Sequence, residues 1–187
     1  MCIRDSGCGG LTKGLRDAGI QVLRGIDNDE TARCTYETNN FGLEFMLADM
    51  KDVSAGEVMN GIDRTGSDLL LAGCVPCQPF SRHVLEPSKD DRRSLIMCVG
   101  TMIRDILPEY VLVENVPGFQ KKSNNYHARF VRLLNDLEYH VDEKVINTAE
   151  YGIPQTRKRY ILLASKKGKI SVPKLSLIHI SEPTRPY

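Results

Sequence analysis

Short apolar runs along the chain alternate with longer segments in which apolar residues recur every three or four positions. The runs are typical of buried β-strands, and the longer segments are typical of amphipathic helices. We expect strands over residues 21–26, 44–48, 69–72, 110–113, 139–146 and 160–164. We expect helices over residues 11–18, 29–38 (capped by Asn28), 54–60 and 93–106, and another around 130–137 after a loop at 117–125. Strands separated by helices predict an α/β fold with a doubly wound, mostly parallel sheet.

Composition indicates the class of protein and its cellular compartment, but it does not identify a function. The chain has 187 residues, a formal net charge of +1 and 41% hydrophobic residues, which is ordinary for a globular enzyme domain. No apolar run is long enough to cross a bilayer, and the cysteines form no paired framework of the kind found in secreted proteins. We therefore expect a reduced, cytoplasmic setting without membrane contact.

The two ends of the chain are related to each other. The first six residues, Met-Cys-Ile-Arg-Asp-Ser, can be back-translated into a DNA string whose reverse complement encodes residues 175–180. This is typical of a transposon end used in sequencing libraries, so we interpret residues 1–6 and 175–187 as translated adapter. The genuine chain is then a domain at 7–165 that lacks its first strand, with 166–174 starting a connection to a further region. We expect a fragment of a longer protein, incomplete at both ends.

A glycine turn opens the first expected helix, and bare backbone of this kind can approach a ligand closely. Asp27 and Asp49 end the next two strands, where a carboxylate can meet the hydroxyls of a nucleotide. An ordinary helix-start turn and solvated strand ends are the alternatives. The candidate ligand-binding residues of this half are Gly7, Cys8, Gly9, Gly10, Asp27 and Asp49.

Cys77 lies in a rigid turn at the end of the strand 69–72. Pro76 and Pro79 fix the backbone on either side, so the thiol is held in one direction. Three interpretations are open from these residues alone. Cys77 is a buried structural cysteine, or it pairs with Cys74 as a CxxC redox or metal motif, or it is a nucleophile.

The six residues Pro-Cys-Gln-Pro-Phe-Ser at 76–81 closely resemble the catalytic loop of the DNA (cytosine-5) methyltransferases. Glu-Asn-Val-Pro at 114–117 resembles the second signature of that family, and the Gln-x-Arg-x-Arg run at 155–159 resembles a third. The signatures occur in the family's order and cover nearly the whole genuine chain. The resemblance implies the Rossmann-like fold of S-adenosylmethionine-dependent methyltransferases.

The resemblance also implies a division of roles. S-adenosylmethionine would lie with its methionine moiety on the glycine turn, its ribose at Asp27 and its adenine at Asp49. Cys77 would add to carbon 6 of a flipped cytosine. Glu114, with its pKa raised by burial, would protonate ring nitrogen 3, and Arg159 would contact the base and steady Glu114. The expected DNA contacts are Gln78 and Ser81 beside the nucleophile, and Arg157 at phosphates.

The expected partner is double-stranded DNA, and a cognate restriction endonuclease is a further expected partner. We expect a monomer in the cytoplasm of a prokaryote or in a phage system, associated with the nucleoid. Because the family's target-recognition region follows the third signature, we expect this fragment alone to be inactive or nearly so. The alternatives are a transfer-RNA cytosine-5 methyltransferase, a CxxC redox or metal protein and a non-catalytic nucleotide-binding module.

Overall fold

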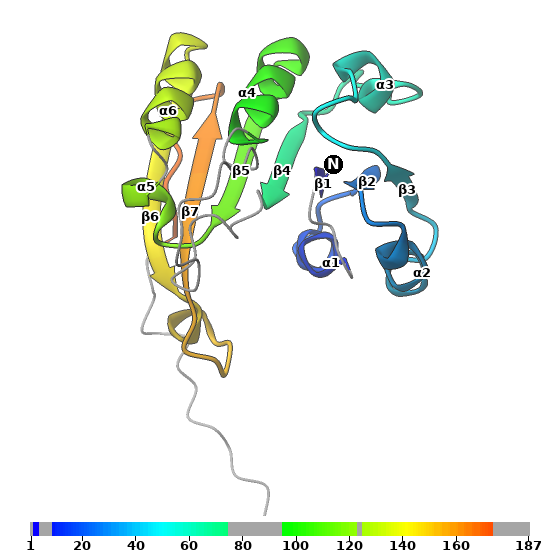
Figure 1. Cartoon of the computed structure of the whole chain (residues 1–187), viewed down its shortest axis with the longest axis horizontal. Coiled ribbons are helices and arrows are strands. Elements are labelled where there is room, and N and C mark those ends of the chain that lie inside the picture. Colours follow the sequence, from blue (N-terminus) through cyan, green and yellow to red (C-terminus); the bar gives the residue numbers. More distant parts are fainter. Residues whose placement is uncertain (1, 4–8, 75–94, 123–124, 174–187) are drawn as a thin grey trace, which may run out of the picture.

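The computed structural model describes residues 2–3, 9–74, 95–122 and 125–173, and within them the strands form one sheet in the order β3-β2-β1-β4-β5-β7-β6 (Figure 1). The strands are β1 Cys2–Ile3, β2 Arg24–Asp27, β3 Glu44–Leu47, β4 Leu70–Cys74, β5 Tyr110–Asn115, β6 His140–Asn147 and β7 Lys158–Ser165. The helices are α1 Gly10–Asp17, α2 Glu30–Asn39, α3 Ala55–Met59, α4 Leu95–Ile106, α5 Phe119–Lys122 and α6 Tyr126–Asp136, with a 3-10 turn η3 at Thr148–Tyr151.

The sheet is mostly parallel, as the alternation of strands and helices predicts. Strands β3, β2, β1, β4 and β5 pair in parallel. The exception is β7, which lies between β5 and β6 and is antiparallel to both. Because β7 runs the other way, it begins at the edge where the parallel strands end.

The first strand differs from the expectation. Residues Cys2–Ile3 form β1 at the centre of the sheet, between β2 and β4, although the sequence predicts that the domain lacks this strand. The physical reason is that backbone pairing does not depend on side-chain identity. The facing edges of β2 and β4 would each expose unpaired N–H and C=O groups without a strand between them. The origin of residues 1–6 as translated adapter remains a prediction.

Apolar side chains cover both faces of the sheet. On one face, Val111 and Val113 of β5 join a large core under α4 and α6, which lie side by side in Figure 1. On the other face, Ala72 of β4 packs with Leu15 of α1, and Leu112 of β5 lies against this second cluster. Alternate residues of one strand thus serve opposite cores, which confirms the doubly wound arrangement.

Two local features of the helices differ from the sequence expectations. Asp29, not Asn28, caps α2, because its carboxylate accepts hydrogen bonds from the backbone N–H of Thr31 at 2.9 Å and from its hydroxyl at 2.6 Å. These bonds hold the pKa of Asp29 below its ordinary value. The short helix α5 also lies within the expected loop at 117–125. Its Phe119 is fully buried, and this tertiary packing explains a turn that the local sequence does not predict.

Candidate active site

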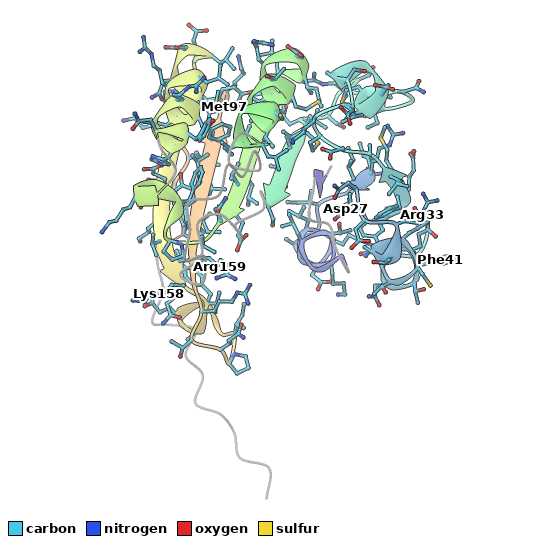
Figure 2. The ribbon with its side chains drawn as sticks, in the orientation of Figure 1. Asp27, Arg33, Phe41, Met97, Lys158 and Arg159 are labelled. Carbon is cyan, nitrogen blue, oxygen red and sulfur yellow. The ribbon has the colours of Figure 1, made fainter. Side chains whose placement is uncertain are left out.

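Three carboxylates and one arginine lie at the edge of the sheet where the parallel strands end. Asp27 is the last residue of β2, Asp49 comes shortly after β3, and Glu114 is near the end of β5. Arg159 is near the start of the antiparallel β7 and therefore reaches the same edge (Figure 2). Ligands bind at this edge in open α/β sheets. The structure thus brings together, at one edge, candidate residues that are far apart in the sequence.

Glu114 and Arg159 form an ion pair. The Nε of Arg159 lies 2.5 Å from Oε1 of Glu114, and the two side chains are 18% and 27% exposed, respectively. Partial burial reduces screening by water, so this pair is stronger than one on an open surface. The second guanidinium contact is local, since Nη1 of Arg159 donates to the backbone oxygen of Lys158 at 2.9 Å. The expected contact that steadies Glu114 is therefore present, while the catalytic roles of both residues remain predictions.

The expected nucleophile, Cys77, lies outside the described residues, as do Gln78 and Ser81. The strand that leads to them is described. Its last residue, Cys74, is the parallel-strand partner of Glu114 in the β4–β5 register. The chain therefore leaves β4 directly beside the glutamate, three residues before Cys77, and this pairing is compatible with a site in which Cys77 and Glu114 act on one substrate.

Asp27 and Asp49 lie at the ends of neighbouring strands, Asp27 as the last residue of β2 and Asp49 two residues after β3. Asp27 is 5% exposed, and its Oδ1 accepts the backbone N–H of Asp29 at 3.1 Å. Asp49 accepts the backbone N–H of Lys51 at 3.0 Å and the side-chain amide of Asn28 at 3.4 Å. The backbone oxygen of Asp27 also accepts the N–H of Ala48 at 2.9 Å, which links the two strand ends. Asn28 thus positions Asp49, a role that the sequence did not indicate.

The glycine turn can hold a ligand close to the backbone. Gly9 is buried and left-handed, with φ at +87°, and it precedes the first residue of α1, Gly10. A Cβ atom at Gly9 would lie 2.1 Å from Nδ2 of Asn40, so no side chain fits there. Gly7 and Cys8 lie outside the described residues. A bare turn beside two carboxylates fits a cofactor with hydroxyl and amino groups, as S-adenosylmethionine has.

The Gln-x-Arg-x-Arg run at 155–159 covers the end of the connection between β6 and β7 and the first two residues of β7. Thr148 holds this connection closed, because its N–H donates to the backbone oxygen of Arg157 at 2.9 Å and its hydroxyl donates to that of Gln155 at 2.8 Å. The side chain of Arg157 is exposed, as is that of Lys158 at the start of β7 (Figure 2). The proposed phosphate contact of Arg157 is compatible with this exposure and remains a prediction.

A second cluster of polar side chains, which the sequence does not predict, surrounds the carboxylate of Glu143 and includes Tyr160, the residue that follows Arg159. Glu143 of β6 accepts hydrogen bonds from the Tyr160 hydroxyl at 2.7 Å and from Gln120 at 3.1 Å, and its Oε2 lies 2.8 Å from Nε2 of His127. Burial and the neighbouring Glu143 carboxylate raise the pKa of Tyr160 well above its ordinary value. The Glu143 carboxylate thus connects its own strand β6 to β7, α5 and α6. No local pattern predicts the cluster, because its members lie far apart in the sequence.

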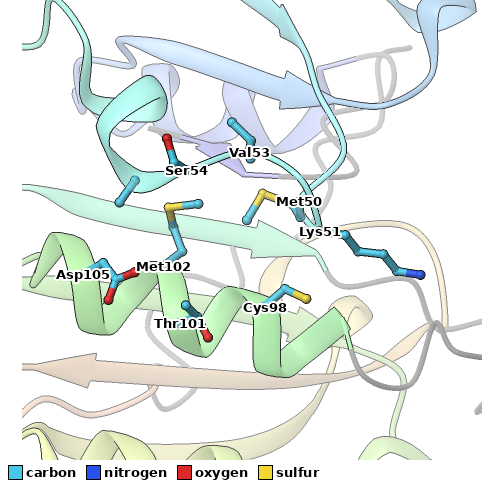
Figure 3. A pocket seen from close by; sticks show the side chains of 9 residues that line it. Met50, Lys51, Val53, Ser54, Cys98, Thr101, Met102 and Asp105 are labelled. Carbon is cyan, nitrogen blue, oxygen red and sulfur yellow. The ribbon is translucent and has the colours of Figure 1, made fainter.

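A pocket of about 270 Å³ opens between α3 and α4, next to the end of β3 (Figure 3). Its floor is apolar, with Met50 and Met102 both almost fully buried, and Cys98 of α4 forms part of the wall. The rim is polar and includes Lys51, Ser54, Thr101 and Asp105. Met50 directly follows Asp49, so the pocket adjoins the cofactor half of the site. It is separate from the Glu114–Arg159 pair.

Two further findings concern only the described parts of the chain. Within residues 2–3, 9–74, 95–122 and 125–173, there is no group of three or more histidine, cysteine, aspartate or glutamate side chains that could hold a metal ion. None of the helices in the same residues combines the length and the apolar character that crossing a membrane requires.

Comparison with known proteins gives consistent matches. The family model for the C-5 cytosine-specific DNA methylases matches residues 5–186. The chain is 35% identical over 167 residues to the Type II methylase M.HgiDII of Herpetosiphon aurantiacus, covering 89% of this chain and 47% of that protein. It is 32% identical over 177 residues to DNA (cytosine-5)-methyltransferase 1 of Rattus norvegicus, covering 88% of this chain and 11% of that protein.

The fold comparison agrees. The crystal structure of the S. pombe Dnmt2 methyltransferase matches with a TM-score of 0.71 at 26% identity, covering 91% of this chain and 51% of that one. The chain thus spans about half the length of M.HgiDII and of this solved structure. The sheet order, the residues at its edge and these matches lead to one conclusion: the chain belongs to the family of C-5 cytosine-specific DNA methylases.

Proposed function

We propose that the protein containing this chain transfers a methyl group from S-adenosylmethionine to carbon 5 of cytosine in DNA, through a covalent adduct with Cys77. The observation that carries the proposal is the Glu114–Arg159 ion pair beside Cys74, the last described residue before the Pro-Cys-Gln-Pro loop. Family membership and the Type II methylase relatives support the same reaction.

Cys77 supplies the nucleophile. Carbon 5 of cytosine is too weak a nucleophile to attack a methyl donor directly. Addition of the Cys77 thiolate to carbon 6 forms an S–C bond and moves the double-bond electrons toward ring nitrogen 3, which makes carbon 5 nucleophilic. The tether is short, because the three residue-to-residue steps from Cys74 to Cys77, through Val75 and Pro76, can span at most about 11 Å. This keeps the thiol near Glu114, the register partner of Cys74.

Glu114 and Arg159 would neutralise the negative charge that develops on the base when the thiolate adds. A proton from Glu114 to ring nitrogen 3 neutralises the electrons displaced by the thiolate. Arg159 then faces the carboxylate that is left, and its guanidinium already lies 2.5 Å from Oε1 of Glu114. After methyl transfer, the proton on carbon 5 is lost to a base, the Cys77 thiolate departs, and the proton on ring nitrogen 3 returns to the Glu114 carboxylate, which restores the aromatic ring. The pair therefore acts as a proton donor with a fixed counter-charge.

The cofactor half of the site would hold S-adenosylmethionine, whose sulfonium supplies the electrophilic methyl group. Gly9 and Gly10, with Gly7 and Cys8 before them, would receive the methionine moiety on bare backbone. Asp27 would accept hydrogen bonds from ribose hydroxyls, and Asp49 would accept one from the adenine amino group. Their position on adjacent strand ends supports these two roles.

DNA is the proposed substrate. Carbon 6 is inaccessible inside a duplex, so the cytosine must be flipped out at a cost of about a few kcal/mol. Gln78 and Ser81, next to the nucleophile, would contact the opened backbone, and the exposed Arg157 would meet phosphates. Because relatives of the chain are Type II methylases, we infer a cytoplasmic prokaryotic or phage enzyme that works beside a restriction endonuclease and acts as a monomer on nucleoid DNA.

The direct test is a methyl-transfer assay on the full-length protein that contains this chain. Labelled S-adenosylmethionine is supplied with duplex DNA of mixed sequence or with transfer RNA, and the product bases are separated by mass spectrometry. The proposal predicts 5-methylcytosine in DNA alone. Label in transfer RNA alone would favour the RNA methyltransferase, and an absence of label in both would remove the enzymatic assignment.

A further inference from the structure

Asn40 lies in an unusual environment. Its side chain is fully buried at the end of α2, where Nδ2 donates to the backbone oxygen of Tyr36 at 3.0 Å. The other amide atom, Oδ1, is buried and has no hydrogen-bond partner among the described residues. Buried polar atoms without partners are rare in folded proteins, because they lose their bonds to water without replacement. This oxygen therefore requires an explanation.

The Asn40 amide packs against the glycine turn. A Cβ atom at Gly9 would lie 2.1 Å from Nδ2 of Asn40 and 3.2 Å from its Cγ. Gly9 is the N-cap residue of α1, and its backbone oxygen accepts the N–H of Lys13 at 2.8 Å. The orphan oxygen thus belongs to an amide in direct contact with the backbone that would hold the cofactor.

Tyr36 connects the same turn to the ribose end of the site. Its ring is fully buried, and its hydroxyl lies 3.2 Å from Oγ1 of Thr12 in the first turn of α1. A Cβ atom at Gly25 would lie 2.2 Å from that hydroxyl, and Gly25 is two residues before Asp27 on β2. One side chain of α2 therefore contacts both α1 and the strand that carries Asp27.

We propose that Tyr36 and Asn40 are positioning residues of the cofactor site, which set the glycine turn relative to Asp27. The Asn40 amide holds the Gly9 end, and its Oδ1 accepts a backbone N–H of the turn in the cofactor-bound state. The Tyr36 hydroxyl holds Thr12 and fills the space beside Gly25. This inference rests on the proposed function, because it assumes that the cofactor binds at this turn.

The test uses S-adenosylhomocysteine as the probe, with its Kd measured by calorimetry and Tm measured on the same samples of the full-length protein. Tyr36→Phe removes only the hydroxyl, and Asn40→Ala removes the amide. The matched control is Tyr139→Phe, which removes another buried hydroxyl, bonded to the backbone oxygen of Pro108 at 2.5 Å in a different part of the core.

We expect Tyr36→Phe and Asn40→Ala each to raise the Kd by about tenfold, because the glycine turn would no longer be held in place before the cofactor binds and binding would have to order it. Tyr139→Phe should lower Tm by about as much as Tyr36→Phe does, because each loses one buried hydroxyl, but it should leave the Kd unchanged. Equal effects of the two tyrosine variants on the Kd would overturn the proposal, and so would a Kd that neither α2 variant changes. A wild-type protein that binds no S-adenosylhomocysteine would instead remove the cofactor site itself, and the proposed function with it.

Discussion

The guanidinium of Arg159 reaches Glu114 diagonally across two antiparallel strands. Their Nε–Oε1 distance is 2.5 Å, although the residue of β7 directly opposite Glu114 is Ile161. The diagonal arises because side chains on one face of a sheet alternate by two residues, so Arg159 and Ile161 share the face of Glu114. The antiparallel direction of β7 is what brings a residue from the start of that strand to the end of β5.

Replacement of Arg159 by lysine is expected to keep the charge and lose the planar donor that faces Glu114. We expect the single-turnover rate of methyl transfer to fall by roughly 10²-fold, since the charge on Glu114 would be less well balanced in the transition state. Quenched-flow measurement with hemimethylated or unmethylated duplex would show this. Arg132→Lys is the control, because Arg132 is exposed on α6 and pairs only loosely with Asp136, at 3.8 Å. An unchanged rate for the Arg159 variant would contradict the assigned role.

Alanine at Gly9 should destabilise the fold. The backbone there has φ at +87°, and the new Cβ atom would overlap the buried Asn40 amide. We expect a loss of at least about 1–3 kcal/mol in the free energy of unfolding. The control is Gly14→Ala in the exposed part of α1, where the Cβ meets nothing within 4 Å and alanine should stabilise by about 0.5–1 kcal/mol. Urea unfolding of both variants measures the difference, and equal effects would contradict the packing described.

Acid should weaken the fold through Glu143. Burial acts to raise the pKa of Glu143, but hydrogen bonds from Tyr160, His127 and Gln120 outweigh it and hold that pKa below the ordinary 4.5. The carboxylate therefore contributes stability that is complete above pH 4.5 and is lost as the pH falls through the lower folded value. We expect Glu143→Gln to flatten this part of the stability profile. The measurement is the free energy of unfolding of the wild-type protein and of Glu143→Gln between about pH 3 and 6. If the two free energies fell in parallel as the pH was lowered, the expectation would be refuted.

Asp27→Asn should weaken cofactor binding and leave DNA binding intact. The carboxylate accepts hydrogen bonds more strongly than an amide oxygen, and its Oδ1 is already fixed by the N–H of Asp29. We expect the Kd for S-adenosylhomocysteine to rise by about tenfold to a hundredfold. The control is Asp52→Asn, which changes an exposed carboxylate that has no proposed role in cofactor binding. A similar Kd for both variants would place the ribose elsewhere.

The sequence predicts the order of the elements well because each one carries its own signal. The apolar run before Cys74 and the helical spacing in α4 depend only on neighbours in the chain. By contrast, the antiparallel insertion of β7 between β5 and β6 cannot be predicted from neighbours in the chain, since strand order is set by long-range packing. The strand at Cys2–Ile3 was missed for a related reason. Its place is determined by the open edges of β2 and β4.

The site was predictable to the extent that its residues resemble family signatures. Glu114 and Arg159 were expected to meet, and the structure brings them together. The supporting residues were not predictable, since Tyr36, Asn40 and Glu143 act through contacts with distant segments. A buried tyrosine or asparagine in a polar helix such as α2 has no periodic signal that separates a supporting role from a structural one.

Covalent capture by a duplex that contains 5-fluorocytosine tests the central claim most directly. Fluorine at carbon 5 blocks the release step, so the enzyme stays bound to the methylated base through the attacking residue. With S-adenosylmethionine present, peptide mass spectrometry of the full-length protein should place the adduct on Cys77. Cys77→Ser should give no adduct, while Cys74→Ser should still give one. An adduct at another residue, or equal loss with both serine variants, would contradict the nucleophilic role of Cys77 and favour a function of the two cysteines as a pair.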